Sequence, residues 1–206
     1  MTLGRFITLE GGEGAGKTTQ SALLADALIA LGLQVIRTRE PGGTPGAELL
    51  RGILLDGSID WAPRAETLLH FAARAEHLAK TILPALHAGR WVICDRFQDS
   101  TLAYQGYGQG AQRDLIILLA DHSEVAPDLT IVLDLDEPIA TQRIGRRGDA
   151  ADRYERLDAA FHARVRQGFR EIAAAEPKRC VLVDASASVE AVHTAMMTAV
   201  RTRLLD

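Results

Sequence analysis

The chain has 206 residues, 47% of them hydrophobic, and a formal net charge of −4. This size suits one α/β domain with a substantial core and leaves little room for a second. The acidic balance argues against a nucleic-acid polymer or a membrane surface as partner, and no apolar run approaches the roughly 18 residues of a membrane span.

The first predicted elements are a strand, a glycine-rich loop and a helix. Arg5–Glu10 is a short apolar and β-branched run typical of a buried strand, and Thr18–Leu31 carries leucines at helical spacing before Gly32 ends the helix. Between them lies the pattern of a phosphate-binding loop (P-loop), Gly11-Gly12-Glu13-Gly14-Ala15-Gly16-Lys17-Thr18.

The chemistry of this loop follows from its residue types. Glycines let the backbone wrap closely around a ligand, so that N–H groups and the helix N-terminus converge on anionic oxygens. Lys17 is expected to lie against the β- and γ-phosphates of a nucleotide. The Thr18 hydroxyl is expected to bind the Mg²⁺ ion held between those phosphates.

The next segment is predicted to be a strand at Gln34–Thr38, followed by the turn cluster Arg39–Gly46. Taken alone, this cluster is more simply a plain loop. Ligands gather at the C-terminal ends of strands in open α/β sheets, however, and Arg39 and Glu40 beside three glycines make it a candidate binding loop. A helix carrying Arg51 is predicted at Ala47–Leu55, and a long helix at Ala62–Ala88 with a bend near Pro84.

A third strand, Trp91–Asp95, ends in an acid that is followed by Arg96. An aspartate at this place can sit over the P-loop near Mg²⁺, while the arginine faces an incoming phosphate. The alternative is a surface ion pair at a strand end. The polar segment Gln98–Gln112 is predicted to be a loop and short helix over a pocket.

The last predicted strands are Leu129–Leu135 and Arg179–Asp184, and between them lies a basic run broken by glycines. Such a run is often only a solvated helix face. Here Gly145 and Gly148 are expected to interrupt the helix, which favours a mobile lid at residues 143–156 that closes arginines over phosphate. Helices are predicted at Arg156–Ala175 and Val189–Leu205.

These elements together predict one α/β domain over residues 1–206 that contains a P-loop: a five-stranded parallel sheet flanked by helices on both faces, with an arginine-bearing lid. Cys94 and Cys180 fall inside predicted strands and are expected to be core residues. The six histidines show no ligand spacing, so no transition metal is implied. Without a signal-peptide pattern, we expect a cytoplasmic protein.

Over essentially its whole length the chain resembles bacterial thymidylate kinase. The P-loop alone would identify only a superfamily, whereas several blocks in this order are far more specific. They are Glu10-Gly11-Gly12-Glu13-Gly14-Ala15-Gly16-Lys17-Thr18-Thr19, Thr38-Arg39-Glu40-Pro41-Gly42-Gly43-Thr44, Phe71-Ala72-Ala73-Arg74, Asp95-Arg96-Phe97, Ala103-Tyr104-Gln105-Gly106 and Pro127-Asp128-Leu129-Thr130.

The resemblance implies a P-loop kinase fold and transfer of the γ-phosphoryl group of ATP to dTMP with Mg²⁺, in a protein that is usually a homodimer. It assigns the ATP site to the P-loop residues Gly11, Gly12, Glu13, Gly14, Ala15, Gly16, Lys17, Thr18 and Thr19, and to Arg143. It assigns the dTMP site to Glu13, Glu40, Pro41, Arg51, His70, Phe71, Arg74, Arg96, Thr101, Tyr104 and Gln105. The metal would be held near Thr18 and Asp95.

Within this scheme, Arg74 would recognise thymine, with Thr101 and Gln105 beside the base, and Arg51 and Arg96 would hold the dTMP phosphate. Tyr104 would pack under the sugar, and Glu13 resembles an acidic residue near the acceptor sugar and metal. Either His70 or Phe71 would stack on thymine.

The catalytic set implied by the resemblance is Lys17, Glu13, Asp95, Arg96, Arg147 and Arg153. Because the P-loop contains no arginine, the lid must supply one, with Arg147 and Arg153 as candidates. Two rival functions stay open: a kinase for another nucleoside monophosphate or a deoxynucleoside on the same scaffold, and a nucleotide-dependent switch. A switch of the GTPase kind usually carries an Asn-Lys-x-Asp motif, and neither Lys80 nor Lys178 lies in one.

Overall fold

The computed structural model describes residues 3–123, 125–147 and 153–205. Within these ranges five strands form one parallel sheet in the order β2-β3-β1-β4-β5. The strands are β1 (Phe6–Gly11), β2 (Val35–Arg39), β3 (Trp91–Asp95), β4 (Leu129–Asp134) and β5 (Cys180–Asp184). Each was predicted to within one residue at either end, because a strand buried on both faces is a short, nearly continuous apolar run.

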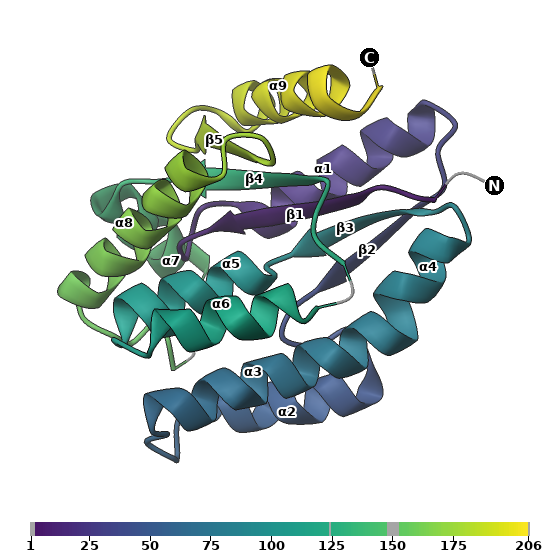
Figure 1. Ribbon diagram of the computed structural model, residues 1–206. Coiled ribbons are helices and arrows are strands. Elements are labelled where there is room, and N and C mark those ends of the chain that lie inside the picture. Colours follow the sequence, from purple (N-terminus) through teal and green to yellow (C-terminus); the bar gives the residue numbers. More distant parts are fainter. Residues whose placement is uncertain (1–2, 124, 148–152, 206) are drawn as a thin grey trace.

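Helices cover both faces of this sheet (Figure 1). They are α1 (Lys17–Ala30), α2 (Pro45–Leu55), α3 (Pro63–His77), α4 (Leu83–His87), α5 (Gln98–Thr101), α6 (Arg113–Asp121), α7 (Glu137–Arg147), α8 (Ala159–Ala175) and α9 (Val189–Val200). None of the helices in the described ranges is long and apolar enough to cross a membrane.

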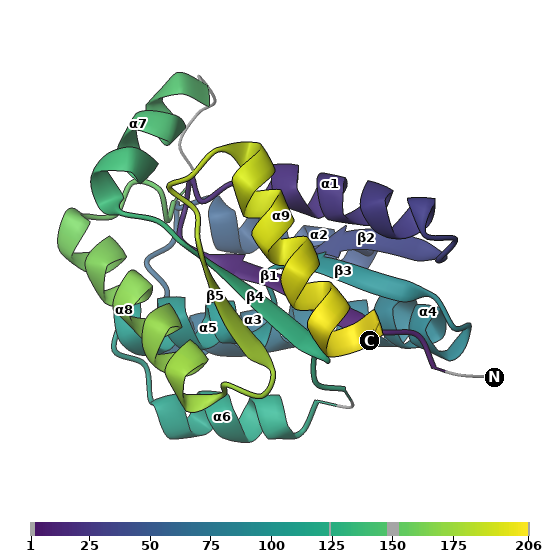
Figure 2. The same ribbon diagram turned by 90° about the horizontal axis from the view of Figure 1, so that it is seen from above.

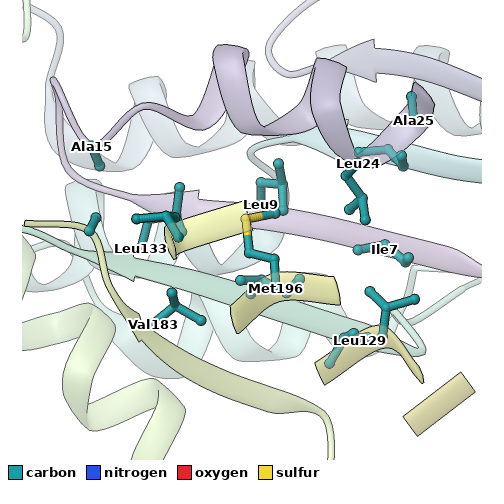
Figure 3. Packing of buried hydrophobic residues seen from close by; sticks show 14 of the residues in the cluster. Ile7, Leu9, Ala15, Leu24, Ala25, Leu129, Leu133, Val183 and Met196 are labelled. Carbon is teal, nitrogen blue, oxygen red and sulfur yellow. The ribbon is translucent and has the colours of Figure 1, made fainter. Parts of the chain in front are cut away.

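The largest core cluster lies between the sheet and helices α1 and α9 (Figure 3). Ile7 and Leu9 of β1 and Leu133 of β4 pack there against Leu24 of α1 and Met196 of α9, and each of these side chains is almost completely buried. On the opposite face, α4, α5 and α8 pack against strands β3, β1 and β4. Cys94 and Cys180 are both buried, as predicted.

Several helical predictions need correction. The long helix predicted at Ala62–Ala88 is divided by a π-helical turn at Leu78–Ile82, where Leu83 N–H bonds to Leu78 C=O. Pro84, which follows this turn, has no N–H to donate to a carbonyl in the preceding turn. The regular α-helical hydrogen bonding is therefore interrupted in the turn before Pro84, which is where the π-helical turn lies. The segment Gln98–Gln112 is mostly helical, since α5 runs directly into a π-helical turn at Leu102–Gly108. Helix α6 was not predicted.

The lid prediction is partly outside the described residues, because residues 148–152, including Gly148, are not described. Helix α7 continues through Gly145, so this glycine does not interrupt it, contrary to expectation. Figure 2 shows α7 standing out from the body of the molecule near the glycine loop that joins β1 to α1. Helix α8 begins at Ala159, later than predicted, because the Asp158 side chain accepts a hydrogen bond from Phe161 N–H and caps the helix there.

Candidate active site

A cavity of about 640 Å³ opens at the C-terminal ends of β1, β2 and β3. The P-loop forms one end of it, and residues from α2, α3, α5 and α7 complete the wall. Seventeen of the residues predicted to form the site line it: Glu13, Gly14, Gly16, Lys17, Thr18, Thr19, Glu40, Pro41, Arg51, His70, Arg74, Asp95, Arg96, Thr101, Tyr104, Gln105 and Arg143.

The P-loop has the backbone that its glycines predict. Gly14 and Gly16 lie in the left-handed region, with φ of 70° and 89°, where side chains are disfavoured. A Cβ on Gly11 would lie 2.4 Å from the carbonyl oxygen of Leu133. No side chain caps the N-terminus of α1, so its N–H groups stay available to an anion.

Lys17 folds back onto the loop that carries it. Its Nζ donates to the carbonyl oxygens of Gly11 at 3.1 Å and Gly12 at 2.7 Å. Burial lowers its pKa to about 8, and the neighbouring Arg96 charge adds to this effect. A positive charge held with so little water contact is well placed to bind phosphate oxygens.

Thr18 and Asp95 meet at the start of α1. The Thr18 hydroxyl donates to Asp95 Oδ2 at 3.0 Å, so the end of β3 lies directly over the P-loop, as the sequence predicted. In the described part of the chain, no group of three or more His, Cys, Asp or Glu side chains is arranged to hold a metal ion. A cation here therefore needs oxygens from a ligand as well as from the protein.

Arg96 points toward the glycine loop, not away from it. Its guanidinium donates to Gly11 C=O at 3.0 Å, Glu13 Oε1 at 2.5 Å and Tyr104 OH at 3.1 Å. Burial alone would raise the pKa of Glu13, but the charges of Arg96 and Lys17 lower it to about 2. The backbone of Arg96 has a φ of 71°, which is a strained conformation for a residue other than glycine. Strained backbone conformations of this kind cluster at functional sites.

The turn that carries Arg96 is held from below by Glu10. This buried carboxylate accepts hydrogen bonds from Phe97 N–H at 2.8 Å and the Ser100 hydroxyl at 2.5 Å. Ser100 in turn accepts from Arg96 at 3.2 Å. Glu10 and Ser100 were not among the predicted site residues, since their role depends on contacts between segments 90 residues apart.

At the opposite end of the cavity, Arg74 is held by two side chains. Its Nε donates to Glu40 at 2.8 Å and its Nη2 to Thr101 at 3.0 Å. Glu40 is itself fixed by His77 at 3.1 Å. The remaining nitrogen, Nη1, is buried and has no hydrogen-bond partner among the described residues, which leaves one donor of Arg74 for a ligand.

The two candidate stacking rings occupy different places. His70 lines the cavity and its Nε2 lies 3.0 Å from the Tyr154 hydroxyl, whereas Phe71 is not among the lining residues and packs against the Arg74 guanidinium at 4.7 Å. Burial, together with the charge of Arg74, lowers the pKa of His70 to about 3. The ring of His70 is therefore neutral near pH 7.

The arginines predicted to act on phosphate are also separated. Arg51 lies at the cavity and donates to Pro41 C=O at 2.9 Å, and Arg143 of α7 reaches the cavity wall. Arg153 instead forms an ion pair with the buried Glu66 at 2.5 Å. Arg147 is the last residue of α7, and its side chain lies outside what the structure describes.

A few predicted residues lie beside the cavity. Gly11 and Gly12 border a second hollow under α7, and Ala15 is buried in the core. Other residues in or next to the cavity wall were missed, among them Tyr154 and Glu66. Glu66 had no clear signal in the sequence, where it lies between Ala65 and Thr67, and nothing there identified its partners.

The chain is similar to known proteins over nearly its whole length. The family described as thymidylate kinase matches residues 9–196. A thymidylate kinase of Gluconobacter oxydans is 55% identical, with 98% of this chain and 96% of the relative covered, and one of Caulobacter vibrioides is 51% identical, with 99% of each chain covered. A crystal structure of thymidylate kinase from Ehrlichia chaffeensis superimposes with a TM-score of 0.79 at 38% identity, covering 96% of this chain and 98% of the other. The chain therefore belongs to the thymidylate kinase family.

Proposed function

We propose that the protein transfers the γ-phosphoryl group of ATP to dTMP, yielding ADP and dTDP for dTTP synthesis. The observation that carries this proposal is one cavity with an anion-binding loop at one end and a buried, partly unpaired arginine at the other, with Arg96 between them. Membership of the thymidylate kinase family supports the same reaction. Because both substrates are cytoplasmic nucleotides, we place the reaction in the cytoplasm.

The ATP phosphates are proposed to lie in the P-loop. Backbone N–H groups at the start of α1 surround them, and Lys17 exchanges the carbonyl oxygens of Gly11 and Gly12 for phosphate oxygens. Arg143 of α7 faces the same cavity and is available to the donor nucleotide. Arg147 and Arg153 stay predictions for the lid arginine that neutralises charge during transfer.

The Thr18 hydroxyl and Asp95 carboxylate form an oxygen pair that fits Mg²⁺, which prefers oxygen ligands and keeps several waters and phosphate oxygens. When bound there, Mg²⁺ would neutralise the charge of the transferred phosphoryl group. Asp95 would hold the ion or one of its waters, and Thr18 would orient its hydroxyl oxygen toward the metal.

For dTMP, the phosphate is proposed to lie between Arg51 and Arg96, which both line the cavity. Tyr104 forms the floor beneath the sugar, and its hydroxyl donates to Glu13 at 2.9 Å. We favour His70 over Phe71 as the ring that stacks on the base, because only His70 lines the cavity.

Base recognition is proposed to use Arg74 and Gln105. The unpaired Nη1 of Arg74 is a donor, which matches the O4 carbonyl of thymine. Gln105 lines the same cavity, and its amide oxygen would accept from the N3–H of the base. Cytosine presents a donor and an acceptor in the reverse order, so the site would leave polar groups unpaired around it.

Transfer is then a direct displacement between two bound nucleotides. The acceptor phosphate is already an anion, so a strong general base is not needed, and the protein contributes positioning and charge neutralisation. Arg96 is fixed by Gly11, Glu13 and Tyr104 before substrate arrives, so its guanidinium requires little reorganisation to meet the acceptor phosphate.

A coupled assay of ADP release tests the reaction, with ATP as donor and dTMP, dUMP, dCMP, dGMP, AMP or thymidine offered in turn. We expect strong dependence on dTMP. Faster turnover with another acceptor would favour the alternative kinase, and hydrolysis of nucleotide without any acceptor dependence would favour a switch. Lys17→Ala and Arg96→Ala are expected to abolish turnover with the fold retained by circular dichroism, and near-wild-type activity in either would refute its role.

We also propose that the protein is a homodimer. Helices α2, α3 and α6 lie on one side of the molecule in Figure 1 and carry large apolar side chains that are at least 45% exposed: Leu49, Ile53, Leu68, Ile117 and Leu118. Exposed apolar side chains that gather on one side are typical of a protein interface. A second copy of this chain is the occupant that the family resemblance supports.

A further inference from the structure

Glu66 is a completely buried carboxylate near the base end of the cavity, and it is surrounded by hydrogen-bond donors. Its Oε1 accepts from Gln105 Nε2 at 2.8 Å, Gln109 Nε2 at 2.7 Å and the Tyr154 hydroxyl at 2.8 Å, while Oε2 accepts from Arg153 at 2.5 Å. Burial would raise the pKa of Glu66, but these four hydrogen bonds together lower it. The side chain is therefore an anion near pH 7, and an anionic carboxylate can only accept.

This acceptor determines which way the Gln105 amide points. A carboxylate facing a glutamine amide admits its NH₂ group and repels its oxygen, so Nε2 must lie toward Glu66. The Tyr154 hydroxyl reinforces the orientation, because its single proton is donated to Glu66 and its oxygen then accepts from Gln105 at 3.2 Å. The amide oxygen of Gln105 has no hydrogen-bond partner among the described residues and is left for the cavity.

We propose that Glu66 is the positioning residue that sets base specificity, by holding Gln105 with its oxygen toward the N3–H of thymine. Glu66 lines no part of the cavity wall, so it acts through Gln105 and not on the substrate. The proposal rests on the assignment of Gln105 to the base, given above. It adds that a neutral side chain at position 66 would let the amide turn over and present its NH₂ group instead.

The test compares two variants of Glu66. If Glu66 orients Gln105, one of them should lose more base specificity, and if Glu66 only fills space, the other should lose more. Glu66→Gln keeps the size of the side chain but loses the charge, and its own amide can donate to the Gln105 oxygen. Glu66→Asp is shorter by one methylene but stays an acceptor-only anion. Turnover is measured with dTMP and with dCMP, and the readout is the ratio of the two kcat/KM values.

Under the proposal, Glu66→Gln lowers the dTMP-to-dCMP ratio by about tenfold, chiefly through a higher KM for dTMP, because one hydrogen bond to the base is lost or reversed. Glu66→Asp keeps more of the ratio than Glu66→Gln does. If Glu66 only fills space, the shorter Asp is the more damaging change, and that order would overturn the proposal. An unchanged ratio in both variants would also overturn it.

Gln109→Met is the matched control. Gln109 gives the same carboxylate a hydrogen bond of 2.7 Å but does not line the cavity, so its loss perturbs the network without releasing Gln105. The ratio is expected to stay at the wild-type value in this variant. Should Glu66→Gln fail to fold by circular dichroism, Glu66→Asp is compared with Gln109→Met. The proposal then expects a lower ratio in Glu66→Asp alone, because its shorter carboxylate holds Gln105 less closely, and equal ratios in the two variants would overturn it. If the wild-type protein did not phosphorylate dTMP, the proposed function itself would fail.

Discussion

Glu10 is a buried carboxyl group that lies beneath the turn that carries Arg96. The carboxylate has no solvent exposure, and its two hydrogen bonds to Phe97 and Ser100 fix the turn that presents Arg96. Burial raises the pKa of Glu10 to about 7, and the nearby charge of Asp99 adds to the increase. Part of the native population thus carries a proton on Glu10 at neutral pH.

The raised pKa predicts a pH-dependent gain of stability in Glu10→Gln. Below the unfolded pKa of 4.5 the side chain is neutral in both states, and as pH rises to about 7 only the unfolded chain releases its proton, which destabilises the native state. At pH 8 the variant is expected to have a free energy of unfolding higher by about 3 kcal/mol. Near pH 5 the difference should fall to about 1 kcal/mol or less, because the unfolded chain has then released only part of its proton. Urea unfolding at the two pH values measures this.

Glu137→Gln is a suitable control, since it removes one acidic group at an exposed position. It should not change the pH dependence of unfolding. The glutamine at position 10 can accept from Phe97 N–H and donate to Ser100, so the turn keeps its hydrogen bonds. A Glu10→Gln effect of the same size at pH 5 and pH 8 would show that the native carboxylate is ionised throughout.

Which site residues could be predicted depended on how local their interactions are. The P-loop is contiguous, so Lys17 and Thr18 were assigned from spacing alone. Arg96 directly follows the predicted strand β3, so its position at the end of that strand was also predicted from neighbouring residues. The partners of Glu66 come from places as far as 88 residues away, and no pattern along the chain brings them together.

At the scale of elements, helix α8 packs against the π-helical turn Leu102–Gly108 through two glycines. A Cβ on Gly168 of α8 would lie 2.7 Å from Cγ of Tyr107, and one on Gly108 would lie 2.5 Å from Cε2 of Phe161. Both contacts meet the ring of an aromatic side chain. The close approach holds Tyr104, which belongs to the same turn, against the cavity.

Gly168→Ala is therefore expected to destabilise the protein by about 1–3 kcal/mol through overpacking, although alanine is the better helix former. Thermal unfolding measures the effect. Gly145→Ala in α7 is the matched control, because a Cβ there meets nothing within 4 Å and should leave the midpoint unchanged or raise it. Equal midpoints in the two variants would mean that α8 can move away from Tyr107 without loss.

Helices and strands were predicted well where the apolar residues follow one regular spacing along the chain. The five strands and helix α1 follow from apolar runs and helical spacing. The π-helical turns were not predicted, because a π turn depends on hydrogen bonds shifted by one residue and leaves no distinct apolar pattern. Helix α6 was also missed. Among its residues only Ile116 is buried, so the helix has no clear apolar face that packs against the core.

For the whole molecule, the strand order places the chemistry. β1 lies at the centre of the sheet, between β3 and β4, so the P-loop emerges next to the end of β3 that carries Asp95 and Arg96. The parallel sheet was predicted from the alternation of strands and helices, which requires crossover connections. The order of the strands was not predicted, because apolar runs do not specify their neighbours.

The proposed homodimer can be tested at the exposed face of α2. Leu49 of α2 is 73% exposed, so Leu49→Glu should leave the folded chain intact while placing a charge in the contact between two copies. Because burying one leucine contributes about 1.5–3 kcal/mol, the dissociation constant should rise by at least about tenfold in sedimentation equilibrium. Leu182→Glu, at an exposed position of β5, is the control and should leave it unchanged. A monomeric wild-type protein, or equal association in both variants, would remove α2 from the interface.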